Sequence, residues 1–302
     1  MLQGIHIFRT PVIRLYQRFQ WRKPTWWDNF LKQTTIYSSA WQSLYWFVQD
    51  RWELWTGRRD ALTPPRRLLF DGVTTYEDFD RFGRIFLEYL IRHGLQPHHA
   101  VLDVGSGNGK NARALTKYLN RQGHYEGFDI VPKGVTWCQK HITPRFPNFR
   151  FQLADLYNKG YNPTGAYQAA DYRFPYADNS FDLVFLTSVF THLLPLDVEN
   201  YVAQIARVLK PGSKCMASFF LLTPESKADM ARHPPARQFI HPLQWDCCRV
   251  ENPDIPEAAI AFEEEYVCSI LSRNGLRVDS IGRGNWCKGE INSQDMVWIV
   301  KA

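Results

Sequence analysis

The chain has 302 residues, of which 45% are hydrophobic and 22% charged, as is usual for a globular protein. Its net charge of +6 is uneven, because residues 1–70 carry +7 and the remaining residues −1. No apolar run reaches the about 18 residues of a membrane-spanning helix, and the six cysteines show no C-x-x-C or zinc-ligand spacing. We expect a cytoplasmic protein with reduced thiols, no metal and no nucleic-acid groove in its near-neutral part.

Residues 1–70 differ in kind from the rest and hold seven of the eleven tryptophans. A capping box at Ser39 and Gln42 precedes apolar residues at helical spacing, so we expect a basic, Trp-rich helical extension. Three roles are open: a lid over the rest of the chain, a membrane-surface anchor acting through residues 1–60, or an interface for a partner chain. Tryptophan and basic charge favour the membrane surface, whereas the broad apolar face of residues 41–55 favours packing against protein.

From residue 71 to 302 strands and helices alternate. Helices are expected at 75–93, with Thr75 as cap, and at 108–119, 133–141, 197–209 and 257–274. Strands are expected at 100–104, 125–129, 149–153, 181–187, 214–222, 277–281 and 296–300. Residues 223–256 are expected to form an irregular insertion on the acceptor side, where a second substrate would bind. The alternation predicts a Rossmann-like α/β domain, whose seven-stranded, mostly parallel sheet carries helices on both faces.

Two acidic strand ends and a glycine loop predict a nucleoside site. In an open parallel sheet, ligands bind beyond the carboxyl ends of the strands. The first strand runs into the sequence DVGSGNG, from Asp103 to Gly109, whose glycines allow a sharp turn and close approach to a ligand. Asp129 ends the next strand, where a carboxylate can accept hydrogen bonds from both hydroxyls of a ribose.

The loop spacing separates two kinds of cofactor. A dinucleotide site favours G-x-G-x-x-G, because its pyrophosphate sits on the helix end. This chain has G-x-G-x-G, with Lys110 where the third glycine would stand. The Asp103 carboxylate would also repel a pyrophosphate, but it suits the ammonium group of a methionine moiety. A nicotinamide-dependent oxidoreductase is therefore the less favoured alternative.

Five motifs in order resemble the class I S-adenosylmethionine-dependent methyltransferases, particularly the type 11 group. They are VLDVGSGNGK (101–110), YEGFDI (125–130), FQLADLY (151–157), YADNSFDLVFLTSVFTHL (176–193) and ARVLKPGS (206–213). The resemblance implies a methyltransferase using S-adenosylmethionine. It implies a cofactor site formed by Asp103, Gly105, Ser106, Gly107, Gly109, Asp129, Ile130, Asp155, Leu156 and Thr187. An insertion at 156–171 departs from the family and leaves the adenine-side acid open between Asp155, which spacing favours, and Asp171.

Methyl transfer needs a base only when the acceptor must lose a proton. His192, which follows the fourth strand, is the leading candidate, and His241 in the 223–256 insertion is the second. Trp286, on a glycine-flanked loop, is expected to form a pocket wall, and Asp182 to have a structural role. The motifs of DNA methyltransferases are absent, so we expect a small-molecule, glycan or lipid-linked acceptor and favour O-methylation. The alternative is a partner subunit that binds the cofactor without catalysing transfer.

Overall fold

A computed structural model describes residues 37–69, 73–232, 238–288 and 293–302 of the chain. The chain divides into two compact units, residues 1–60 and residues 61–302. The division lies ten residues before the expected boundary near residue 70. Leu62 and Leu68 pack against the core of the larger unit, which explains why residues 61–69 belong to it.

The described part of the first unit contains the helix α3, Tyr37–Trp55. The expected capping box is not at the start of this helix, because Ser39 already lies inside it. Several large apolar side chains of α3 are at least half exposed, among them Tyr45, Phe47 and Trp55. Arg51 lies over the ring of Phe47, and Arg58 lies 4.5 Å from the ring centre of Trp52. Exposed aromatic and basic groups are thus interleaved along this helix.

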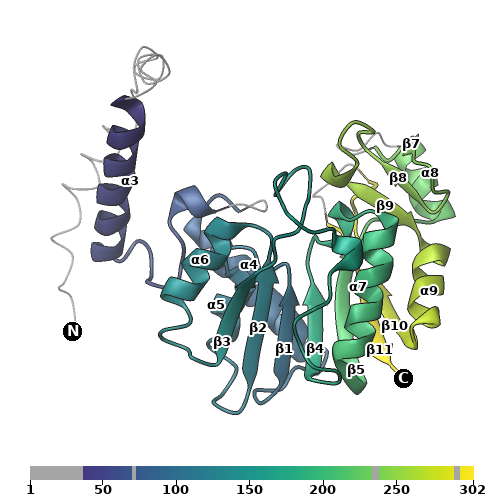
Figure 1. Ribbon diagram of the computed structural model, residues 1–302, viewed down its shortest axis with the longest axis horizontal. Helices are drawn as coiled ribbons and strands as arrows, with labels where there is room; N and C mark the ends of the chain where they lie inside the picture. Colours follow the sequence, from purple (N-terminus) through teal and green to yellow (C-terminus); the bar gives the residue numbers. More distant parts are fainter. Residues whose placement is uncertain (1–36, 70–72, 233–237, 289–292) are drawn as a thin grey trace, which may run out of the picture. The chain divides into compact units, whose positions relative to one another are not determined.

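The second unit is built on a seven-stranded sheet in the order β10-β11-β5-β4-β1-β2-β3 (Figure 1). Only β11 runs antiparallel to its neighbours, so the expected mostly parallel sheet is confirmed. The strands are β1 (Ala100–Val104), β2 (His124–Asp129), β3 (Phe149–Leu153), β4 (Phe181–Leu186), β5 (Leu209–Phe219), β10 (Leu276–Gly282) and β11 (Asp295–Lys301). All five residues of β1 are buried, Asp103 among them, as the central position of the strand requires.

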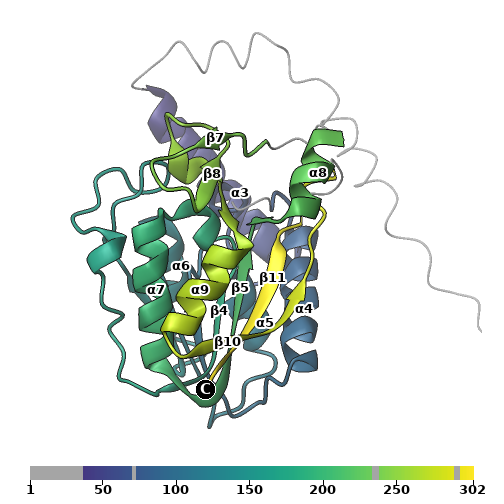
Figure 2. The same ribbon diagram turned by 90° about the vertical axis from the view of Figure 1, so that its right-hand side faces the viewer.

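Helices cover both faces of the sheet (Figure 2). One face packs on α4 (Tyr76–Arg92), α5 (Lys110–Leu115) and α6 (Pro132–His141), and the other on α7 (Pro195–Val208) and α9 (Glu264–Arg273). Thr75 caps α4 as expected, since its hydroxyl accepts a hydrogen bond from the Asp78 N–H at 3.0 Å.

Residues 221–263 form a small second sheet that the sequence did not predict. Its order is β6 (Leu221–Leu222), β9 (Ile260–Glu263), β8 (Cys248–Val250) and β7 (His241–Pro242), with helix α8 (Pro224–Arg232) beside it. The expected helix at 257–274 was wrong in its first turns. Ile260–Glu263 pairs with two strands as β9, and the helix begins only at Glu264.

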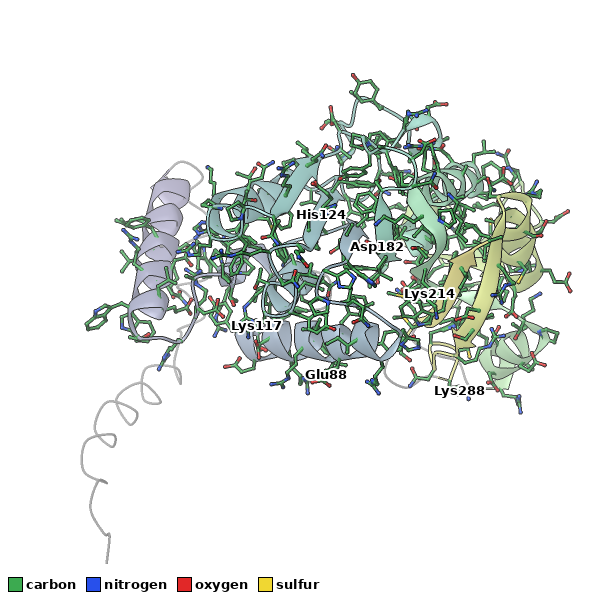
Figure 3. The ribbon with its side chains drawn as sticks, turned by 90° about the horizontal axis from the view of Figure 1, so that it is seen from below. Glu88, Lys117, His124, Asp182, Lys214 and Lys288 are labelled. Atoms are coloured by element: carbon green, nitrogen blue, oxygen red, sulfur yellow. The ribbon has the colours of Figure 1, made fainter. Side chains whose placement is uncertain are left out.

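Asp182 is structural, as expected, at the edge of the sheet where the parallel strands begin (Figure 3). It accepts hydrogen bonds from the Ala100 N–H at 2.9 Å and from Lys210 Nζ at 2.7 Å, which join β1, β4 and β5. Burial alone would raise the pKa of Asp182, but these two donors hold it below its ordinary value. This edge lies opposite the loops that form the candidate site.

Candidate active site

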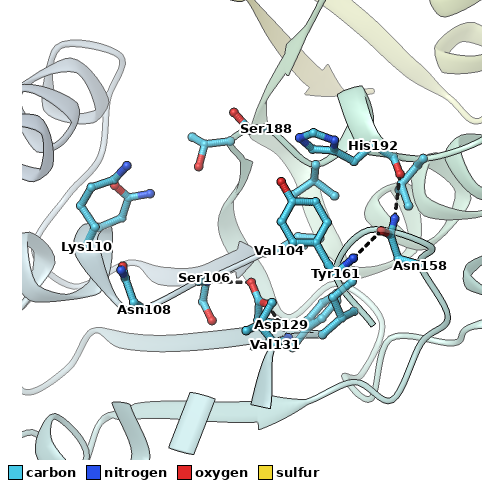
Figure 4. Close-up of a pocket in the computed structure, with 18 of the residues that line it drawn as sticks. Val104, Ser106, Asn108, Lys110, Asp129, Val131, Asn158, Tyr161, Ser188 and His192 are labelled. Carbon is cyan, nitrogen blue, oxygen red and sulfur yellow. Dashed lines mark hydrogen bonds between the residues drawn. The ribbon is translucent and has the colours of Figure 1, made fainter. Parts of the chain in front are cut away.

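A pocket opens at the carboxyl ends of β1, β2 and β4 (Figure 4). Many of its lining residues are those expected to bind a cofactor or an acceptor: Gly105, Ser106, Gly107, Asp129, Ile130, Thr187 and His192. These residues come from segments up to 87 positions apart in the chain. The parallel sheet brings them together because it aligns the ends of its strands at one edge.

The loop after β1 needs glycine for two reasons. Gly105 has φ +85°, in the region that residues with a side chain rarely adopt, and a Cβ there would lie 2.4 Å from Cγ2 of Val189. The Gly105 and Ser106 N–H groups donate to the Phe128 carbonyl at 2.9 and 3.0 Å. The turn is therefore fixed against β2. Because Gly105 has no side chain, a ligand can approach the backbone of the turn closely.

Asp129 is held by the backbone around it. Its Oδ2 accepts from the Gly107 N–H at 2.7 Å and its Oδ1 from the Val131 N–H at 2.8 Å. Burial raises the pKa of Asp129 above its ordinary value, although these two donors act to lower it. A carboxylate oxygen can accept more than one hydrogen bond, so the group still has lone pairs for ribose hydroxyls.

Asp103 does not line the pocket, contrary to the expectation that it faces a methionine ammonium. Its side chain is fully buried, and its Oδ2 accepts from the Tyr125 hydroxyl at 2.6 Å. Burial raises the pKa of Asp103 to about 7, opposed by the Tyr125 hydrogen bond and assisted by the nearby Asp129 carboxylate. Among the described residues, its Oδ1 has no hydrogen-bond partner. Asp103 thus joins β1 to Tyr125 of β2 inside the core.

The adenine-side residues also differ from expectation. Asp155 is exposed, and its Oδ1 accepts from Asn162 Nδ2 at 3.2 Å. Leu156 is buried in the core, and Asp171 ends a short helical turn at 169–171. None of the three lines the pocket. The chain folds back after β3, and Asn158 and Tyr161 reach the pocket in their place.

Polar groups beyond β4 form the pocket wall opposite β2. Ser188 has φ +56°, which is unusual for a residue other than glycine. Its N–H donates to Ser218 Oγ at 2.8 Å, and its Oγ accepts from Gln294 Nε2 at 3.0 Å. These contacts fix the strained turn that carries Thr187 and Ser188 at the pocket.

His192 lies on the turn Phe190–His192, at the rim of the same pocket. Its Nδ1 lies 2.8 Å from the Glu257 carbonyl oxygen. A carbonyl only accepts, so in the neutral ring the proton sits on Nδ1 and the lone pair on Nε2. This is the tautomer that a general base acting through Nε2 requires.

Three further expected residues lie away from the pocket lining. His241 is on β7, the edge strand of the small sheet. Trp286 is 2% exposed and packs in a separate core with Phe220 and Phe239, and its Nε1 donates to Asp295 Oδ2 at 2.8 Å. The expectation that Trp286 is a pocket wall was therefore wrong. Gly109 precedes α5 with φ +82°, and a Cβ there would meet the Cys138 sulfur at 2.7 Å.

Several lining residues were not predicted from the sequence. They are Val104, Asn108, Lys110, Asn111, Phe128, Val131, Asn158, Tyr161, Ser188, Val189, Leu193 and Tyr201. The insertion after the third strand was visible in the sequence, but nothing in its pattern showed that it returns to the pocket. Within the described residues, no group of three or more His, Cys, Asp or Glu side chains could hold a metal ion.

Comparison with known proteins identifies the domain. Residues 102–217 match the family described as methyltransferase domain. The sterol 24-C-methyltransferase ERG6B of Gibberella zeae is 30% identical over 140 residues, which are 45% of this chain and 32% of that protein. The ubiquinone/menaquinone biosynthesis C-methyltransferase UbiE of Cupriavidus taiwanensis is 30% identical over 131 residues, which are 43% of this chain and 47% of that one. The chain thus spans about a third to a half of the length of these relatives.

The fold comparison agrees with the sequence matches. The PH0226 protein of Pyrococcus horikoshii superposes with a TM-score of 0.52 at 17% identity, covering 78% of this chain and 97% of that one. The strand order, the glycine loop and the family match all agree with a methyltransferase domain. The cofactor of this domain is S-adenosylmethionine. Residues 102–217 thus form a methyltransferase domain, and in its motifs and fold the chain is similar to the class I S-adenosylmethionine-dependent methyltransferases.

Proposed function

We propose that this protein transfers the methyl group of S-adenosylmethionine to a hydroxyl group of a small-molecule, glycan or lipid-linked acceptor. The observation that carries the proposal is that His192 and the glycine loop line one pocket. A base beside the cofactor site serves an acceptor that must lose a proton, and a hydroxyl needs this help more than an amine does.

The residues present fit the cofactor. Gly105 leaves space that a side chain would fill, and Ser106 Oγ is buried without a hydrogen-bond partner among the described residues. Asp129 would accept hydrogen bonds from the ribose hydroxyls, and Ile130 would border the adenine. When bound, the cofactor supplies an activated methyl group on a sulfonium. The protein then mainly aligns donor and acceptor, which can lower the barrier by about 7–11 kcal/mol.

His192 would take the proton of the acceptor hydroxyl on Nε2. The contact from Nδ1 to the Glu257 carbonyl holds the ring in this tautomer and would stabilise the imidazolium that forms. Glu257 belongs to the turn Pro256–Ala258, just before β9. The turn before β9 would thus contribute to catalysis through its backbone.

Carbon is the second candidate acceptor atom. The sterol and quinone relatives are named as C-methyltransferases, whereas the 27-O-demethylrifamycin SV methyltransferase of Amycolatopsis mediterranei, 29% identical over 125 residues, is not. Analysis of the product distinguishes the two. A methoxy group supports the proposal, and a new carbon–methyl bond refutes O-methylation.

Untargeted metabolite profiling with isotopically labelled S-adenosylmethionine tests the activity directly. Lysates with the protein should contain a labelled product that is absent without it. A partner subunit that only binds the cofactor would give no labelled product and no S-adenosylhomocysteine with any acceptor.

With the acceptor identified, His192→Ala should lower turnover about 10²- to 10⁴-fold and leave cofactor affinity nearly unchanged. His241→Ala is the matched control, because that histidine lies outside the pocket lining. Near-normal turnover of the His192 variant would remove it from the mechanism.

The role of residues 1–60 is a separate proposal. We favour a lid over the acceptor site, followed by a peripheral membrane contact and then an interface for a partner chain. The half-exposed aromatic residues of α3, with arginines over two of its rings, support a binding role for the surface of this helix. No described helix is long and apolar enough to cross a bilayer.

A further inference from the structure

The segment between β3 and the turn at 169–171 forms a closed loop, here named the 156–167 loop. Its ends are joined by a bridge between Leu156 and Tyr167, where the Tyr157 N–H donates to the Tyr167 carbonyl at 2.8 Å. A second bridge joins Asn158 and Asn162. These contacts give the loop a defined shape, so the positions of its side chains follow from its backbone.

Asn158 fastens this loop to the turn that carries His192. Its side chain is 4% exposed, and its Nδ2 donates to the His192 carbonyl at 3.1 Å. Its Oδ1 accepts from the N–H groups of Gly160 and Tyr161, both at 3.0 Å. One buried amide therefore fixes both the His192 backbone and the backbone that presents Tyr161.

Tyr161 packs against the His192 ring. The two ring centres are 5.2 Å apart, with an angle of 75° between the ring planes, and both residues line the pocket (Figure 4). The Glu257 carbonyl contacts the same imidazole at Nδ1. Lys159 Nζ also donates to the Asp254 carbonyl, so the 156–167 loop and the segment preceding β9 meet beside His192.

We propose that Tyr161 is a positioning residue for His192, and that the 156–167 loop orients the imidazole through it. The proposal rests on the proposed role of His192 as base. The Glu257 carbonyl selects the tautomer protonated on Nδ1 only while the imidazole stays in place, and a ring that swings away loses this contact. An edge-to-face aromatic neighbour favours this packed position of the ring by about 3- to 10-fold.

Nitrogen NMR of the imidazole tests this without an acceptor. The ¹⁵N-labelled protein is saturated with S-adenosylhomocysteine, and the His192 signals are identified by their loss in His192→Gln. Wild type should show the neutral ring protonated on Nδ1. In Tyr161→Leu the ratio of the two tautomers should move by about 3- to 10-fold toward the form protonated on Nε2. Tyr161→Phe should restore the wild-type spectrum, because the contact uses the ring.

Tyr167→Leu is the matched control, because Tyr167 closes the same loop but is 66% exposed and outside the pocket lining. It should leave the His192 signals unchanged. Asn158→Ala should shift the tautomers in the same direction as Tyr161→Leu, because it releases the loop. A Tyr161→Leu spectrum in which only proton ring-current shifts change, with the tautomer ratio kept, overturns the proposal.

The result is independent of whether His192 is the base. If His192→Ala keeps its turnover while Tyr161→Leu shifts the tautomers, the proposed function fails and the positioning role stands. If both roles are correct, Tyr161→Leu should lower kcat, measured at saturating cofactor, about 3- to 10-fold. Tyr161→Phe should recover it.

Discussion

Replacing Asp129 by alanine should weaken cofactor binding while the fold persists. The side chain is the only one in the described pocket lining whose carboxylate can accept from ribose hydroxyls. It also holds the Gly107 and Val131 N–H groups at 2.7 and 2.8 Å, so its loss loosens the glycine loop as well. A hydrogen bond to a charged group contributes about 1.5–3 kcal/mol, and each 1.4 kcal/mol is about tenfold in affinity. We therefore expect a 10- to 100-fold loss of affinity.

Isothermal titration calorimetry with S-adenosylhomocysteine measures this loss, and a thermal melt of each variant confirms folding. Asp155→Ala is the matched control, since that carboxylate is exposed and bonded to Asn162. It should change the affinity less than about twofold, as is usual for a residue outside the contact. Unchanged affinity in a folded Asp129→Ala variant would refute the assignment of the ribose site. A large loss in Asp155→Ala would instead restore that residue to the adenine side.

Three further outcomes can be measured. Gly105→Ala and Gly212→Ala both place a side chain at positive φ, and each should lower the free energy of unfolding by about 1–3 kcal/mol. Only the new side chain at position 105 meets Val189, so only Gly105→Ala should abolish cofactor binding in calorimetry. Because burial raises the pKa of Asp103 to about 7, the folded state holds a proton that the unfolded state releases near pH 4, so stability falls as pH rises from about 4 to 7. Chemical denaturation should show this fall in wild type and not in Asp103→Asn; equal slopes contradict it. A membrane contact through residues 1–60 predicts sedimentation with anionic vesicles that weakens at high salt and disappears on deletion of the segment, whereas a lid predicts that the deletion lowers stability or acceptor turnover.

The sequence was sufficient for the sheet and for the position of the glycine loop after β1. Short, mostly apolar runs such as Ala100–Val104, in which Asp103 is the one charged residue, predict buried central strands, because strands covered on both faces are largely apolar. The glycines at 105 and 107, followed by an acid at Asp129, predict a nucleoside site, because glycine allows a close approach and a carboxylate can accept from ribose hydroxyls. These signals are local, so they can be read along the chain.

Only the tertiary structure decided which side chains meet at the pocket. Asp103 and Trp286 look functional in the sequence, yet both are buried, Asp103 against Tyr125 and Trp286 in a separate core. The residues Ile260–Glu263 show no alternating pattern that separates them from the acidic helix that follows. They form a strand because they pair with β6 and β8. Tyr161 reaches His192 across 31 residues through contacts made by Asn158. Such contacts depend on how loops fold back in space, and residue spacing along the chain does not encode that.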